Sequence, residues 1–164
     1  MSWVNNFIAT GFGVGERVPA PGTVASIMAA AVIFIISSIL GIGEFTASSG
    51  YWVILIILTF LGIVTAGNYE RESNIIDPPE VVIDEVLGFF IAVAFLPPVT
   101  PEAEIYLTPG RLITALVIFR IIDITKVYPM NKLEIVAGGL GIMLDDIYAG
   151  ILTNIIIRVA LVLL

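Results

Sequence analysis

Four groups of ionisable, glycine and proline residues stand at one end of otherwise apolar segments of this chain. They are Ala20-Pro21-Gly22-Thr23, Asp84-Glu85, Arg120 with Asp123 and Lys126, and Asp145-Asp146. Ionisable side chains inside lipid-length apolar runs are costly, and for that reason they usually mark a functional site. We therefore expect these residues to form one polar site at a membrane surface.

The charged groups contain five acids and two bases, an excess of three negative charges. Carboxylates packed at a lipid boundary cannot all stay ionised unless a cation neutralises them. The chain has no cysteine and no histidine, so the ligands must be oxygen atoms, which favour Mg²⁺ ahead of Ca²⁺ or Mn²⁺. The candidate metal ligands are Asp84, Glu85, Asp145 and Asp146, and together with Asp123 they are also the candidate catalytic carboxylates.

Adjacent residues on a helix point about 100° apart. We therefore expect one acid of each adjacent pair to bind the metal directly and the other to act through water or an ion pair. Arg120 and Asp123, three residues apart, should share a helix face, and Arg120 and Lys126 suit a phosphate group. Simpler explanations stay open: acids at a helix N-terminus favour the helix dipole, Arg120 can pair with Asp123 alone, and Lys126 can extend to the interface.

A stretch rich in glycine and proline, residues 11–23, precedes the first long apolar segment. Such a loop can present backbone N–H groups to an oxyanion at a helix N-terminus, and Thr23 is a candidate N-cap. Gly22 and Thr23 are therefore candidate substrate-binding residues, with a plain interfacial turn as the alternative. No strand precedes the glycines, which argues against a dinucleotide-binding fold.

The apolar segments predict a polytopic membrane protein, an all-α helical bundle in a single domain, residues 1–164. The chain is 59% hydrophobic and 13% charged, whereas soluble domains are about 25% charged, and a membrane span needs about 20 apolar residues. Pro97-Pro98 should end the third helix at Leu96. The five expected membrane helices are Val24–Gly43, Tyr51–Gly67, Val81–Leu96, Arg111–Ile124 and Gly141–Leu163, and Trp3–Phe12 is expected to lie in the interface.

Basic residues favour a cytoplasmic N-terminus, because Lys and Arg accumulate on the inner side of a membrane. Arg111 falls at the outer edge of the fourth helix, and Arg158 near the outer end of the fifth could extend to the interface there. Tyr51 and Trp52 are expected to anchor the protein in the interface. With this orientation all four groups lie on the cytoplasmic side, together with the basic residues Arg17, Arg71, Lys126 and Lys132.

Five blocks of sequence carry the candidate residues: Ala9–Gly15, Pro19–Thr23, Val82–Gly88, Phe119–Ile124 and Gly138–Gly150. Their spacing and order, from about Ala9 to Ile151, resemble the phosphatidylglycerophosphatase A family, and the Gly-Ile-Met-Leu-Asp-Asp-Ile run is the most specific block. The resemblance implies a Mg²⁺-dependent lipid phosphatase of the bacterial inner (cytoplasmic) membrane. Its implied reaction is the hydrolysis of phosphatidylglycerophosphate to phosphatidylglycerol and phosphate.

The missing residue types narrow the mechanism, because phosphatase routes through histidine or cysteine are closed. A metal-activated water remains, or a carboxylate or Thr23 nucleophile, and we favour the water. The alternative function is a cation- or proton-coupled transporter, which should carry polar residues across the whole membrane. We expect no nucleic-acid partner, and nothing in the sequence indicates an oligomeric state.

Overall fold

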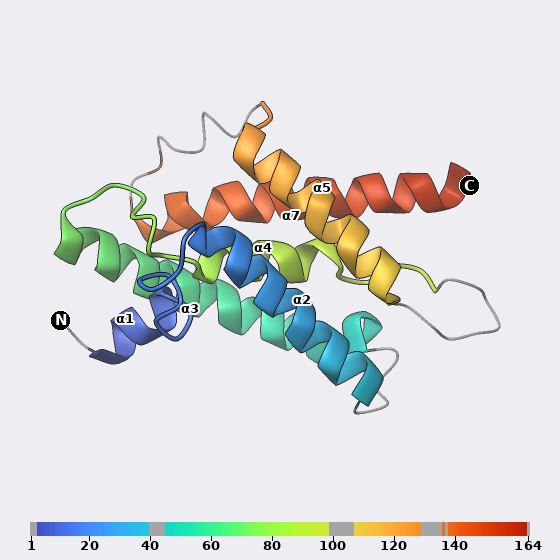
Figure 1. Cartoon of the computed structure of the whole chain (residues 1–164), viewed down its shortest axis with the longest axis horizontal. Coiled ribbons are helices and arrows are strands. Elements are labelled where there is room, and N and C mark those ends of the chain that lie inside the picture. The colour runs from blue at the N-terminus through green and yellow to red at the C-terminus, as the bar shows by residue number, and fades with distance from the viewer. Residues whose placement is uncertain (1–2, 40–44, 99–106, 129–135, 137, 164) are drawn as a thin grey trace.

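The computed structural model describes residues 3–39, 45–98, 107–128, 136 and 138–163, and within them the fold is entirely helical (Figure 1). The all-α prediction is therefore confirmed. The predicted end of the first span at Gly43, and Lys132 of the orientation argument, lie outside the described residues. The elements are α1 (Trp3–Ala9), α2 (Pro21–Ile39), the short 3₁₀ helix η1 (Phe45–Ala47), α3 (Ser49–Ser73), α4 (Ile83–Ala92), α5 (Pro109–Thr125) and α7 (Gly139–Leu163).

Three of these helices are long and apolar enough to cross a membrane: α2, α3 and α7. Large apolar side chains cover their outer surfaces, among them Phe60, 72% exposed, and Val162, 84% exposed, as expected of helices that face lipid. A membrane helical bundle is thus confirmed, but the predicted number of five spans is not. The ten residues of α4 rise only about 15 Å, half of the roughly 30 Å hydrocarbon layer.

The short helix α4 lies in the middle of the bundle and packs against α2, α3, α5 and α7 (Figure 1). Its closest approach is to α7. A Cβ on Gly150 would lie 2.3 Å from the carbonyl oxygen of Gly88, and a Cβ on Gly88 would lie 2.7 Å from the carbonyl oxygen of Asp146. Only glycine permits backbones to come this close, and the contact brings the acidic start of α4 beside Asp146.

The C-terminal end of α4 is held by a side chain from α7. The last carbonyl groups of a helix have no partner within it, and lipid offers no hydrogen-bond donor in place of water. The amide nitrogen of Asn154 donates to the carbonyl oxygens of Ile91, Ala92 and Ala94 at 3.3, 3.0 and 2.8 Å. Asn154 therefore allows α4 to end inside the bundle.

Two further side chains bind carbonyl groups near this end, and both differ from their predicted positions. Arg158 donates to the carbonyl oxygens of Ala94 and Phe95 instead of extending to the interface. Tyr51 is fully buried and its hydroxyl donates to the carbonyl oxygen of Phe90 at 2.9 Å, so it is not an interfacial anchor. In both cases the side chain satisfies a buried carbonyl group, and this stabilises the protein more than placing the side chain at the membrane surface would.

Replacing Asn154 should destabilise the bundle. Asn154→Leu removes the side-chain donor of the Ala92 carbonyl, whereas the Ile91 carbonyl still accepts from the Ala94 amide and the Ala94 carbonyl from Arg158. One buried carbonyl without a donor costs about 2 kcal/mol, so we expect the melting temperature in detergent to fall by roughly 4–8 °C. Ile155→Ala, at the neighbouring and half-exposed position, is the matched control and should cost much less. Equal melting temperatures for the two variants would show that these hydrogen bonds do not stabilise the fold.

Candidate active site

A polar cavity of about 300 Å³ lies where the starts of α2, α4 and α7 meet the end of α5. The four groups that are separate in the sequence therefore lie together in the fold. The segment before α4 closes one side of the cavity with Asp77, Pro78, Pro79 and Val81. The candidate residues that line it are Gly22, Asp84, Glu85, Arg120, Asp123, Lys126, Asp145 and Asp146.

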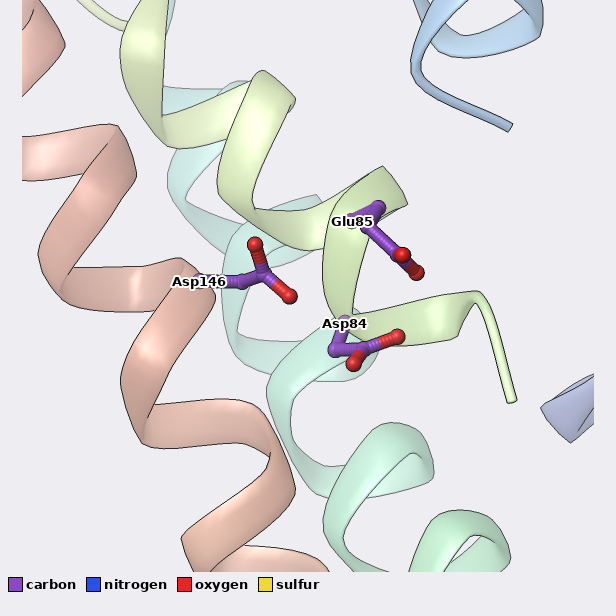
Figure 2. A group of neighbouring side chains, drawn as sticks. All are labelled: Asp84, Glu85 and Asp146. Atoms are coloured by element: carbon purple, nitrogen blue, oxygen red, sulfur yellow. The ribbon is translucent and has the colours of Figure 1, made fainter. Parts of the chain in front are cut away.

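Three carboxylates form the centre of this cavity. One side-chain oxygen each of Asp84, Glu85 and Asp146 lies within 4.8 Å of the other two. Figure 2 shows Asp146 projecting from α7 toward the first turn of α4, which carries Asp84 and Glu85. Asp84 and Asp146 are buried, and each of the three carboxylates has one buried oxygen without a hydrogen-bond partner among the described residues.

This carboxylate group fits a cation site. Buried acceptors without donors are rare in folded proteins and require a partner. Two oxygens that bind one Mg²⁺ at about 2.1 Å are at most about 4.2 Å apart. The three carboxylate oxygens lie within 4.8 Å of one another, so small side-chain movements would allow all three to bind one ion. Oxygen ligands alone favour a hard cation such as Mg²⁺.

The two adjacent acid pairs are arranged differently. On α4 both Asp84 and Glu85 belong to the group, and the expectation that only one of them binds a metal directly stays a prediction. The Glu85 side chain is one methylene longer, which allows it to reach the Asp84 carboxylate in spite of the angle between neighbouring residues. On α7 only Asp146 belongs to the group, and the neighbouring Asp145 carboxylate lies 3.5 Å from the Lys126 ammonium.

Burial raises the pKa of the Asp84 carboxyl well above its ordinary value, and the charges of Glu85 and Asp146 raise it further. Burial also raises the pKa of Glu85, opposed by a hydrogen bond with Asp84 and by the charge of Arg120. Because metal ligands must be deprotonated, protons and a metal ion compete for these oxygens.

The two basic residues of the cavity are held by acids. Arg120 Nη1 lies 2.7 Å from Asp123 Oδ2 and 3.9 Å from Glu85 Oε1, and Lys126 turns toward Asp145. Lys126 occupies the left-handed conformation that ends α5, with φ of 44°. Arg120 and Lys126 both line the cavity beside the carboxylates. From there their side chains can reach an anion in the cavity.

Asp77 is a cavity residue that the sequence reasoning missed. It stands directly before two prolines and has φ of 50°, a conformation that is uncommon for a residue other than glycine and often occurs at functional sites. An acid next to a proline pair, seven residues before Asp84, was the available signal. With Asp77 the cavity contains six carboxylates and two cationic side chains, and this excess of four negative charges would repel a phosphate unless a cation were bound.

Gly22 and Thr23 face different surfaces. A Cβ on Gly22 would lie 1.9 Å from Glu85 Oε1 and 3.2 Å from Arg120 Nη1, so this backbone packs directly on the cavity residues. Thr23 lines an apolar groove between α2 and α5 instead. The helix already begins at Pro21, as proline favours, so Thr23 lies within the first turn and is not the N-cap.

The amides of the first glycines before α2 are used within their own loop. The amides of Gly13 and Gly15 donate to the side chain and the carbonyl of Thr10, at 3.1 and 2.9 Å. The loop packs instead on the segment before α4, where a Cβ on Gly15 would lie 1.9 Å from the carbonyl oxygen of Glu80. Its role in the structure is to position the start of α4.

Gly22 is so close to Glu85 that a methyl group at this position should disturb the active site. We expect Gly22→Ala to displace the Glu85 carboxylate and to lower kcat/KM by about 100-fold, because a shift of about 1 Å in a catalytic group has an effect of this size. Gly110→Ala is the matched control: it is also the second residue of its helix, but its nearest neighbour would be 3.9 Å away. A Gly22→Ala enzyme as active as Gly110→Ala would contradict the tight fit.

Comparison with known proteins identifies the family of this chain. The sequence profile described as phosphatidylglycerophosphatase A matches residues 7–161. Proteins named phosphatidylglycerophosphatase A from Haemophilus influenzae and Escherichia coli K12 are 30% and 28% identical to this chain, over 93% and 90% of it and over 85% and 78% of their own lengths.

A protein from Bacteroides thetaiotaomicron, whose name gives phosphatidylinositol-3-phosphatase as a provisional assignment, is 35% identical over 160 residues, 97% of this chain and 94% of that protein. No solved structure matches the chain. The predicted resemblance is confirmed by the profile and the relatives: the chain belongs to the phosphatidylglycerophosphatase A family and is a phosphatase.

Proposed function

We propose that this bacterial membrane protein is a Mg²⁺-dependent enzyme that hydrolyses phosphatidylglycerophosphate to phosphatidylglycerol and phosphate. The observation that carries the proposal is the convergence of the Asp84, Glu85 and Asp146 carboxylates in a cavity that also contains Arg120 and Lys126. We place the cavity at the cytoplasmic face of the inner membrane, because the bias of Lys and Arg in the loops favours that orientation.

Asp84, Glu85 and Asp146 would hold the Mg²⁺, with Asp145 close by. When bound, the ion would supply Lewis-acid polarisation of a phosphate oxygen and a water of lowered pKa. Mg²⁺ typically takes one or two carboxylates together with waters and substrate phosphate oxygens, and an anionic cavity of this composition suits that pattern.

The chain's own residues would bind the phosphate and move the protons. Arg120 and Lys126 would bind the phosphate oxygens and stabilise the charge that develops on them. Hydrolysis forms a bond between the water oxygen and phosphorus and breaks the bond between phosphorus and the glycerol oxygen. A cavity carboxylate accepts the water proton, for which Asp123 and Asp145 are the candidates outside the metal-binding group, and the glycerol oxygen takes up a proton as it leaves.

A cation- or proton-coupled transporter would need a polar path through the membrane. Beyond the cavity, α4 and α7 touch at Gly88 and Gly150, and the polar side chains that follow, Asn154 and Arg158, bind carbonyl groups at the end of α4. This arrangement favours the phosphatase. In proteoliposomes we accordingly expect no Mg²⁺ or proton flux above that of protein-free liposomes.

The substrate assignment is tested with three lipid phosphate monoesters under identical conditions. Purified protein in mixed micelles with Mg²⁺ should release phosphate fastest from phosphatidylglycerophosphate, and more slowly from phosphatidic acid and from phosphatidylinositol 3-phosphate. The last is included because of the name of the Bacteroides relative. Faster release from phosphatidylinositol 3-phosphate would overturn the substrate assignment, and no release from any of the three would overturn the function.

A further inference from the structure

A lipid substrate places two demands on the protein, because its phosphate and its acyl chains need different surroundings. The acidic cavity suits only the phosphate. An apolar groove of about 420 Å³ lies between α2 and α5, lined by Leu116, Val117, Ile121 and Ile124 together with Thr23. We call this surface the α2–α5 groove.

Arg120 connects the groove to the cavity, because it lines both. The cavity and the groove also meet at the start of α2, where Gly22 lines the cavity and the next residue, Thr23, lines the groove. The wall residues Val117 and Ile121 are 51% and 56% exposed, so the groove opens to the bilayer. A lipid with its phosphate beside Arg120 would therefore have an apolar channel leading away from its headgroup into the membrane.

We propose that the α2–α5 groove holds an acyl chain of the substrate while its phosphate occupies the acidic cavity, so that the lipid enters sideways between α2 and α5. The inference rests on the proposed function and identifies a lipid-binding subsite of the same active site. Because the bilayer is as apolar as the groove, the contact adds little affinity. Its effect is to orient the phosphate for reaction.

A larger apolar groove of about 660 Å³ lies between α3 and α7, lined by Ile56 and Phe60 among others. It shares no lining residue with the acidic cavity. Its charged residue, Arg158, donates to carbonyl groups at the end of α4. Continuity with the cavity therefore favours the smaller α2–α5 groove.

The test compares a diacyl substrate with the same headgroup lacking acyl chains. Val117→Trp fills the groove one helical turn from Arg120. We expect the ratio of kcat/KM for dioleoyl phosphatidylglycerophosphate to kcat/KM for its deacylated headgroup to fall by about tenfold or more. Two controls should keep the wild-type ratio: Ile113→Trp, at an exposed α5 position outside the groove, and Ile56→Trp in the α3–α7 groove.

An unchanged ratio in Val117→Trp, or a similar fall in Ile56→Trp, would overturn the groove assignment. A wild-type protein that releases no phosphate from the lipid would instead overturn the proposed function, so the two failures are distinguishable. A second measurement uses only the wild-type protein, so it does not depend on whether a variant folds. The protein is photolabelled with phosphatidylglycerophosphate that carries a diazirine in one acyl chain. Labels should map to residues 116–124, and labels on α3 and α7 alone would contradict the proposal.

Discussion

Asp84→Asn and Asp146→Asn are each expected to lower kcat by at least about 1,000-fold. Either change removes one anionic oxygen from the three-carboxylate group and with it the ability to hold the cation, whose contribution to catalysis is several kcal/mol, and about 4 kcal/mol corresponds to a factor of 1,000. The measurement is Mg²⁺-dependent phosphate release from phosphatidylglycerophosphate by each purified variant.

Stability separates this loss of activity from a loss of folding. Without metal the three closely spaced carboxylates repel one another, so neutralising one of them should leave the melting temperature of the metal-free protein unchanged or raise it. Glu72→Gln on α3, an exposed acid outside the cavity, is the matched control and should keep wild-type kcat. A well-folded Asp84→Asn enzyme with more than a tenth of wild-type turnover would refute the proposed site.

Removal of divalent cations should abolish activity. After treatment with EDTA we expect less than about 1% of the original rate, because the cavity's excess negative charge then repels the phosphate and no Lewis acid is present. Mg²⁺ should restore the rate fully and Mn²⁺ in part. Ca²⁺ should restore little, because it prefers six to eight ligands at about 2.3–2.6 Å.

Binding can be followed independently of turnover. Mg²⁺ should raise the melting temperature of the wild-type protein, as any ligand specific to the folded state does, and this increase should be absent in Asp84→Asn. Full activity of the wild-type protein after EDTA, with metal analysis confirming less than one ion per ten chains, would remove the metal from the mechanism.

The features that could be predicted from sequence are those with a local physical cause. Hydropathy over about 20 residues identifies a lipid-facing helix, and α2, α3 and α7 follow from it. The cost of a charge in an apolar run singles out Asp84, Asp146 and Arg120. The predicted alternation of five spans put these residues at one level. The number of spans is not confirmed, but the structure brings the residues into one cavity.

The features that could not be predicted depend on partners distant in the sequence. The apolar run to Leu96 predicted one long helix, but α4 ends at Ala92 and the chain turns through Phe95, with φ of 52°. The donor that permits this end, Asn154, lies about 60 residues further along the chain. Asp77 was missed for a related reason: its place before two prolines is visible in the sequence, but the residues that line the cavity with it on α5 and α7 lie far along the chain.

The half-length helix α4 also has a consequence for how the protein is made. Ribosomes synthesise chains from the N-terminus, so α4 leaves the ribosome before α7 exists. Until then its acidic start lacks Asp146, and its last carbonyl groups lack Asn154 and Arg158. Ten residues with unbonded carbonyl groups cannot settle stably in lipid alone. We therefore expect α4 to insert, and the carboxylates of Asp84, Glu85 and Asp146 to come together, only after α7 has been synthesised.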